Sequence, residues 1–259
     1  MSKGGWGVNL KLFKFTNLIM INKKVFKFLM IFLFIAVNIS FSQDKKAISF
    51  EKQNKKGKYL AFSFGGGLNY CDNKSLKTYI EYELPFYNNL SENDRLSSFY
   101  TGFEIFAGAE YQLSKNFSLK GEYSYFTKSY NSVSYSDYDF TYGNHQPYLT
   151  LYYLIPQENS FVKFGAGVGY LSSSLTRKAY SIESDYTSTG FALRLDLAVD
   201  LQMSKVLAGY IAGYVNQTFQ SDLKDGNGNL LLNRSGGTVN LNSLGFGIRL
   251  GVELFFFNI

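Results

Sequence analysis

The chain has 259 residues and a formal net charge of +6. Residues 1–42 contain six lysines and no acidic residue, so the rest of the chain has 20 basic and 20 acidic residues. A neutral remainder excludes the basic surface expected of a nucleic-acid-binding protein. A single cysteine, Cys71, excludes an intrachain disulfide.

Residues 20–42 have the three parts of a secretory signal peptide. A short basic stretch begins at Met20, an apolar core covers 28–37, and small residues flank a cleavage point before Gln43. The apolar core is shorter than the ~20 residues that a spanning helix needs. We therefore expect a cleaved signal peptide over 20–42, an overlong N-terminal extension over 1–19 and a flexible periplasmic lead-in over 43–57.

The remaining residues, 58–259, repeat one pattern, in which apolar side chains alternate with small or charged ones. Because successive side chains of a strand point to opposite faces, each such segment has one apolar face. The clearest runs from Leu244 to Phe256, thirteen residues with an apolar side chain at every second position. The predicted strands cover about 59–70, 98–113, 117–129, 146–155, 161–172, 191–203, 206–218 and 244–256.

The connections between these strands alternate in length. Short links are expected near 114–116, 156–160 and 204–205, and long ones over about 71–97, 130–145, 173–190 and 219–240. Outer-membrane barrels have short periplasmic turns and long extracellular loops. The sequence therefore predicts an all-β fold over 58–259, an eight-stranded antiparallel up-and-down transmembrane β-barrel in the cell outer membrane, with the outer-membrane lipid as its surroundings.

Alternation alone does not say which face of each strand points outward. A soluble barrel of the lipocalin kind would put the apolar face inside. The signal peptide and the glycines on the charged face favour a lipid-facing apolar wall around a crowded polar interior. Strand 206–218 is ambiguous, since both its faces are apolar or small. Aromatic girdles are expected at Tyr111, Phe117, Tyr153 and Phe161 near the periplasm and at Tyr70, Phe99, Tyr125, Tyr170 and Phe191 near the cell exterior.

Charges of both signs share the face that we expect to line the interior. The predicted lumen charge network comprises Glu104, Lys120, Glu122, Lys163, Arg194, Asp196, Asp200, Arg249 and Glu253, and Glu110 lies on the same face. The interior of an eight-stranded barrel is only wide enough for side chains to fill it. We therefore expect a salt-bridged plug, with a selective conduit for ions or solutes as the alternative.

Residues for catalysis or for cofactor and metal binding are scarce. The sole histidine, His145, has no serine beside it in sequence, and one histidine and one cysteine far apart do not form a metal site. We predict no enzymatic activity, no cofactor and no metal. A lipid-modifying enzyme is considered because some eight-stranded outer-membrane barrels have that activity.

The C-terminal segment Arg249-Leu250-Gly251-Val252-Glu253-Leu254-Phe255-Phe256 resembles the assembly signal of outer-membrane barrel proteins. The resemblance implies that Arg249, Gly251, Leu254 and Phe256 direct the chain to the barrel assembly machinery. Residues 58–259 as a whole resemble the outer membrane protein β-barrel domain family, which includes porin-like and PorT-like proteins. The fold is similar to the small OmpA/OmpX-type barrels.

The predicted function follows from a closed lumen and long loops. We expect a structural or surface-interaction role through the extracellular loops. The segment 130–142 is rich in tyrosine and partly alternating, which suggests that its two strands extend beyond the membrane as a hairpin. The alternative function is a small channel or carrier for ions or apolar solutes.

Overall fold

The computed structural model describes residues 58–83, 100–131, 138–157 and 160–257. The predicted extension, signal peptide and lead-in lie outside these residues. The described elements are β1 (Tyr59–Asp72), α3 (Lys74–Glu83), β2 (Thr101–Ser114), β3 (Phe117–Asn131), β4 (Tyr138–Pro156), β5 (Ser160–Ala179), β6 (Ile182–Gln202), β7 (Leu207–Gln220) and β8 (Ser243–Phe257). No helix within the described ranges is long and apolar enough to span a membrane.

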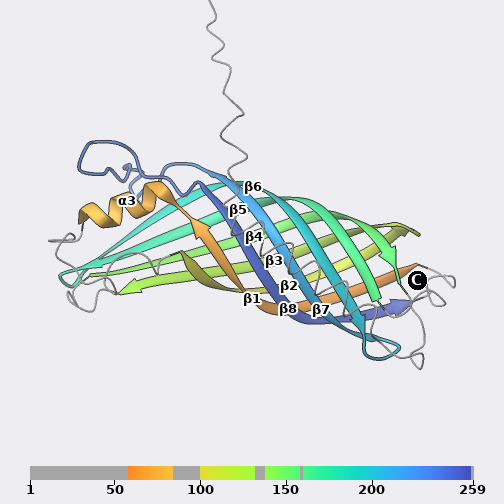
Figure 1. Ribbon diagram of the computed structural model, residues 1–259. Coiled ribbons are helices and arrows are strands. Elements are labelled where there is room, and N and C mark those ends of the chain that lie inside the picture. The colour runs from red at the N-terminus through yellow and green to blue at the C-terminus, as the bar shows by residue number, and fades with distance from the viewer. Residues whose placement is uncertain (1–57, 84–99, 132–137, 158–159, 258–259) are drawn as a thin grey trace, which may run out of the picture. The chain divides into compact units, whose positions relative to one another are not determined.

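The eight strands form one closed barrel in which each strand pairs with its neighbours in the chain (Figure 1). Every pairing is antiparallel, and β8 closes the barrel on β1 from Tyr59↔Phe257 to Asp72↔Leu244. Closure leaves no open strand edge in the wall, so backbone N–H and C=O groups are paired without water. The predicted eight-stranded antiparallel barrel is confirmed.

The outer surface of the barrel wall is apolar on every strand. One residue from each strand, between 40 and 66% exposed, illustrates this: Phe64, Ile105, Tyr123, Leu149, Val168, Leu195, Phe219 and Leu250. An exposed apolar surface that surrounds a whole barrel is unstable in water and is stabilised by lipid. The wall therefore faces a bilayer, and the soluble barrel with an apolar interior is excluded.

The structure decides two points that the alternation left open or misplaced. On β7, Tyr210 and Tyr214 point into the barrel, and Ile211 and Val215 point outward. The prediction that Phe161 belongs to an outer aromatic girdle is wrong. Phe161 lies on the same face of β5 as Lys163 and is fully buried, because it packs inside the barrel beside Tyr59. Phe99 lies outside the described residues.

Beyond the lipid-facing wall, β3 to β6 continue with the polarity of their two faces reversed. Their outward side chains become polar: Thr127, Ser129, Thr141, Ser172, Ser174, Thr176, Lys178, Glu183, Asp185, Thr187 and Thr189. Their inward side chains are buried and mainly apolar, among them Phe126, Tyr130, Phe140, Tyr142, Leu171 and Leu175, with Lys128, Ser173 and Ser188 as polar exceptions. This is the pattern of a sheet that has water outside and a hydrophobic core inside, so these extensions lie outside the bilayer.

One predicted long loop, 173–190, is wrong. The strands β5 and β6 pair without interruption up to Ala179↔Ile182, and only Tyr180 and Ser181 connect them. Both turn residues have positive φ angles, 49° and 66°. A two-residue turn of this kind matches the twist of a hairpin but normally carries glycine or asparagine, which is why no turn was predicted at these residues. The predicted hairpin extension of β3 and β4 is confirmed up to Asn131 and Tyr138.

The extended strands, α3 and residues 221–242 lie together at one end of the barrel, and we call this assembly the cap (Figure 1). A single hydrophobic cluster joins Leu76, Tyr79 and Ile80 of α3 to the extended strands and to the 221–242 segment, which contributes Leu223, Leu231, Val239 and Leu241. The helix α3 was missed within the predicted loop 71–97. Its three buried residues are spaced for one helical face, but ten residues are too few to form a stable helix without the cap core.

Candidate functional site: the charged interior and the cap

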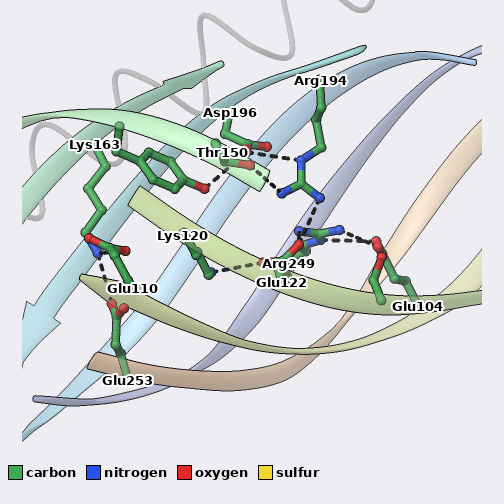
Figure 2. A network of polar contacts seen from close by, with 12 residues as sticks. Glu104, Glu110, Lys120, Glu122, Thr150, Lys163, Arg194, Asp196, Arg249 and Glu253 are labelled. Atoms are coloured by element: carbon green, nitrogen blue, oxygen red, sulfur yellow. Dashed lines mark hydrogen bonds and ion pairs between the residues drawn. The ribbon is translucent and has the colours of Figure 1, made fainter. Parts of the chain in front are cut away.

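Among the described residues, ten charged side chains point into the barrel below the cap from five strands, and all are at most 7% exposed. They are Glu104 and Glu110 of β2, Lys120 and Glu122 of β3, Lys163 of β5, Arg194, Asp196 and Asp200 of β6, and Arg249 and Glu253 of β8. All nine residues of the predicted lumen network are among them. The structure divides the ten residues into two groups, which Figure 2 shows side by side.

The first group, which we call the arginine cluster, contains Arg194, Arg249, Lys120, Glu104, Glu122 and Asp196. Glu122 is at its centre, because its Oε1 accepts from Arg249 Nη1 at 2.6 Å and from Arg194 Nη1 at 2.8 Å. Its Oε2 lies 3.0 Å from Lys120 Nζ. Arg249 also binds both oxygens of Glu104, and Arg194 Nε donates to Asp196 at 3.1 Å. Three cations thus face three carboxylates.

Inward tyrosines complete the arginine cluster. Tyr214 donates to Glu104 at 2.5 Å, and Tyr152 donates to Asp196 at 3.1 Å. The Arg194 guanidinium lies 4.0 Å from the centre of the Tyr148 ring, and the Arg249 guanidinium 4.4 Å from that of Tyr214. Hydrogen bonds and cation–π contacts lower the cost of burying these charges. Sequence reasoning missed the tyrosines. On β4 the available signal was that Tyr148 and Tyr152 lie on the face opposite the outward Leu149 and Leu151.

Glycines on β5 make room for these rings. A Cβ atom at Gly165 would lie 2.5 Å from the Tyr152 ring, and one at Gly169 would lie 2.6 Å from the Tyr148 ring. Such distances are shorter than van der Waals contact, so larger residues at these positions would displace the tyrosines. The glycines on the charged face therefore reflect a filled interior.

The second group, which we call the lysine cluster, contains Lys163, Glu110, Asp200 and Glu253. Lys163 Nζ lies 2.8 Å from Glu110 Oε2, 2.5 Å from Asp200 Oδ2 and 3.1 Å from Glu253 Oε2. Glu110 also accepts hydrogen bonds from the hydroxyls of Tyr59 and Ser118, at 2.6 and 2.7 Å. One cation here faces three carboxylates.

Apolar side chains fill the interior around the two clusters. Phe106, Ala198, Tyr210 and Ala212 form a buried group. A second group comprises Tyr59, Ala61, Tyr152, Leu154, Phe161, Ala208 and Phe255. Side chains therefore occupy the interior as expected for eight strands.

Polar contacts hold α3 in the cap. Arg177 Nη1, from the extension of β5, donates to the Tyr79 hydroxyl at 2.8 Å and lies 3.3 Å from Glu83 Oε2. Lys77 donates to the Tyr100 hydroxyl at 2.6 Å. Before the helix, Asn73 donates to the backbone carbonyl of Leu241 at 2.9 Å, which links α3 to the 221–242 segment.

Burial raises the pKa of Tyr79 from its ordinary value of 10.0 to about 12, and the nearby Arg177 guanidinium acts in the opposite direction. Between these two pH values an undocked Tyr79 loses its proton while a docked one keeps it, so rising pH favours undocking. We expect a spin label at Thr78→Cys, in a Cys71→Ser background, to become mobile between about pH 10 and about pH 12. The same label combined with Tyr79→Phe should show no such step, and an identical step in both proteins would assign the change to other groups.

His145 and Cys71 lie apart from the two charge clusters. His145 is on the outer face of β4, where its Nδ1 is 2.5 Å from the Tyr123 hydroxyl and its ring lies against Tyr125. Cys71 is buried at the base of the cap, and its Sγ is 2.9 Å from Asn73 Oδ1. Lys128 donates to the same oxygen at 2.8 Å.

The predicted assembly signal lies on β8, the strand that closes the barrel. Arg249 points inward into the arginine cluster, and Phe256 is half exposed on the outer wall. Gly251 pairs with Gly65 of β1. A Cβ atom at Gly251 would lie 2.4 Å from the Phe64 carbonyl oxygen, so the two strands approach closely at this point.

No protein-family model and no curated protein matches the chain. Solved structures of similar architecture include the attachment invasion locus protein Ail of Yersinia pestis in complex with the heparin analogue sucrose octasulfate (TM-score 0.47, 9% identity, 77% of this chain and 99% of that one). A major outer membrane protein of Thermus thermophilus has a TM-score of 0.47 at 13% identity, over 76% of this chain and 99% of that one. Neisserial surface protein A has a TM-score of 0.42 at 12% identity, over 76% and 96%.

The closed topology and the lipid-facing wall decide the class of the protein. A closed barrel of eight antiparallel strands, apolar outside and polar inside, is the architecture of outer-membrane barrels. The chain is an outer-membrane β-barrel protein.

Proposed function

We propose that this protein is a closed outer-membrane barrel that displays the cap at the cell surface, where the cap contacts molecules outside the cell. The observation that carries the proposal is the reversed polarity of β3 to β6 beyond the lipid-facing wall. A barrel that served only as a membrane anchor would have no need of a second hydrophobic core outside the bilayer. In the cap, this core stabilises a folded surface that lies outside the bilayer.

We infer the direction of the barrel in the membrane from the connections at the end opposite the cap. At the end opposite the cap, residues 115–116 connect β2 to β3, and 203–206 connect β6 to β7. Short turns face the periplasm in outer-membrane barrels, and this supports an orientation with the cap outside the cell.

Exposed apolar side chains at the surface of the cap support a contact role. Tyr180 is 62% exposed and Ile182 67% exposed, both at the tip of the β5–β6 hairpin. Tyr180 has a positive φ angle, which is unfavourable for a residue with a large side chain, and the conformation is therefore retained at a cost. Leu230 and Leu232 are also exposed.

The location of the cap can be tested with cysteine labelling. In a Cys71→Ser background, Ser181→Cys at the hairpin tip should react with a membrane-impermeant maleimide on intact cells. Lys205→Cys, in an exposed turn at the other end, should react only after the outer membrane is permeabilised. Labelling of Lys205→Cys alone on intact cells would reverse the orientation and refute the proposal.

A contact role predicts that the exposed tip is needed for adhesion but not for folding. Cells that display Tyr180→Ser together with Ile182→Ser should bind host-cell or bacterial surfaces less than cells with the wild-type protein. Leu195→Ala on the lipid-facing wall serves as the matched control and should leave adhesion unchanged. Equal adhesion of the tip variant and the wild type would contradict the contact role.

The alternative role as a small channel or carrier requires an open path through the interior. Two charge clusters, the apolar groups around them and the cap all occupy that path. We expect the purified protein to show little or no conductance in planar bilayers. Large, steady conductance of the wild type would favour the channel. A lipid-modifying activity has no support from the position of His145 on the outer wall.

The same proposal includes the route to the membrane. The barrel assembly machinery would recognise β8 through Arg249, Gly251, Leu254 and Phe256, which belong to the strand that completes the barrel. The resemblance of this strand to assembly signals supports that assignment.

A further inference from the structure

The two charge clusters differ in their balance. In the arginine cluster, Arg194, Arg249 and Lys120 offset Glu104, Glu122 and Asp196. In the lysine cluster, Lys163 alone faces Glu110, Asp200 and Glu253. The excess of carboxylates among the ten interior charges therefore falls entirely on the lysine cluster.

The three carboxyl groups of the lysine cluster are buried and close together. Asp200, Glu253 and Lys163 have no exposed surface, and Glu110 is 1% exposed. One oxygen of each carboxyl group lies within 3.1 Å of Lys163 Nζ, so these oxygens are no more than about 6 Å apart. Like charges that are buried at such distances cannot all ionise without a large cost.

Hydrogen bonds distinguish Glu110 from the other two carboxyl groups. Glu110 accepts from Tyr59, Ser118 and Lys163, which stabilise its charged form. Within the described residues, no donor is placed on Asp200 Oδ1 or Glu253 Oε1. Asp200 and Glu253 meet at the same nitrogen, Lys163 Nζ, and two ionised carboxylates are both acceptors, so neither can donate to the other.

The groups around the lysine cluster do not supply the missing positive charge. Tyr59 of β1, Ser118 of β3 and Tyr152 of β4 are neutral. Lys120 of β3 is bound to Glu122 and lies over the Tyr210 ring of β7, so it already belongs to the arginine cluster. Phe255 of β8 covers Lys163 on another side. Lys128, the other buried lysine or arginine of the described ranges, is bound at the base of the cap.

We propose that Asp200 and Glu253 share a proton at neutral pH, and that the lysine cluster is a proton-binding site inside the barrel. The shared proton lets one carboxyl group donate to the other and supplies the donor that both lack. Glu110 remains ionised and pairs with Lys163. At higher pH the shared proton is lost and the cluster gains a further negative charge. The closed barrel therefore becomes less stable as the pH rises and the Asp200–Glu253 pair loses its proton.

Infrared spectroscopy of the wild-type protein tests the proposal directly. The folded protein at neutral pH should show the carbonyl band of a buried protonated carboxylic acid, with a deuterium-dependent shift. The band should disappear in Asp200→Asn and persist in Asp196→Asn. Asp196 is the matched control, because it lies on the same strand and face but in the balanced cluster. A wild-type spectrum without the band would overturn the proposal, and this result does not depend on any variant folding.

Unfolding kinetics give a second, independent readout. Asparagine resembles a protonated aspartic acid, so Asp200→Asn should unfold no faster than the wild type at neutral pH and should lose the decline of stability with rising pH. Asp196→Asn should unfold at least about tenfold faster, because it removes one of the two carboxylates bound to Arg194 and leaves the balanced cluster with an uncompensated buried positive charge. Faster unfolding of Asp200→Asn than of Asp196→Asn would refute the shared proton. Stoichiometric metal ion in the chelator-treated protein by native mass spectrometry would refute it too, because a cation would then balance the cluster.

Discussion

Replacing Arg249 with alanine should destabilise the folded barrel by ~3–5 kcal/mol, because it removes one partner of a buried network of ion pairs. Arg249 binds Glu104 through two nitrogens and Glu122 through a third. Without Arg249, Glu104 keeps only the hydrogen bond from Tyr214 and becomes an uncompensated buried charge. Equilibrium unfolding by urea from lipid vesicles measures the effect.

Two variants show whether the loss comes from the network. Arg234→Ala, at an exposed position of the 221–242 segment, is the control for removal of an arginine and should change stability by no more than about 0.5 kcal/mol. Adding Glu104→Gln to Arg249→Ala should restore part of the stability, since it removes the unpaired charge. A loss below ~1 kcal/mol for Arg249→Ala would contradict a plug held by ion pairs. In planar bilayers, Arg249→Ala is expected to show a small ion conductance through the weakened plug.

Introducing an arginine on the outer wall should have opposite outcomes at two heights of one strand. Leu195 and Thr187 both lie on the outer face of β6, and both are exposed. Leu195 is in the lipid-facing band, where a charge near the bilayer centre costs ~2–4 kcal/mol. Thr187 lies beyond the point where the polarity of the strand reverses. Leu195→Arg should therefore unfold at a much lower urea concentration than the wild type.

Thr187→Arg is the matched control and should stay within about 0.5 kcal/mol of the wild type, because its side chain lies in water. The two variants add the same side chain to the same face of the same strand, so their difference reports the surroundings alone. Equal losses at both positions would place the extended part of β6 in lipid. Equal tolerance would mean that the wall does not face lipid.

Alternation of side chains was sufficient to predict the barrel. An apolar residue at every second position of β8, and similar patterns in seven other segments, determine which side chains share a face, because the period of a strand is two. The same parity placed the network residues from Glu104 to Glu253 on one face. These properties are local to each strand, so they could be read without knowing which strands are neighbours.

The pairing of the charges was decided by the tertiary structure alone. Glu122 meets Arg194 and Arg249, which are 72 and 127 residues away in the chain, only because closure of the barrel brings β3, β6 and β8 around one interior. The division into a balanced and an unbalanced cluster is therefore invisible in the sequence. The packing of the interior is decided in the same way. Ala198 of β6 is fully buried in one group with Phe106 of β2 and Tyr210 and Ala212 of β7.

The cap, like the pairing of the charges, could not be predicted from the sequence alone. The strands β3 to β6 keep their alternation of side chains when they leave the membrane, but their apolar and polar faces exchange sides because water replaces lipid outside. The period is the same in both environments, so the sequence indicated the strands without indicating where the bilayer ends. The helix α3 and the 221–242 segment depend on contacts with those inverted strands, and only the folded barrel brings Ile80, Leu175 and Val239 into one core.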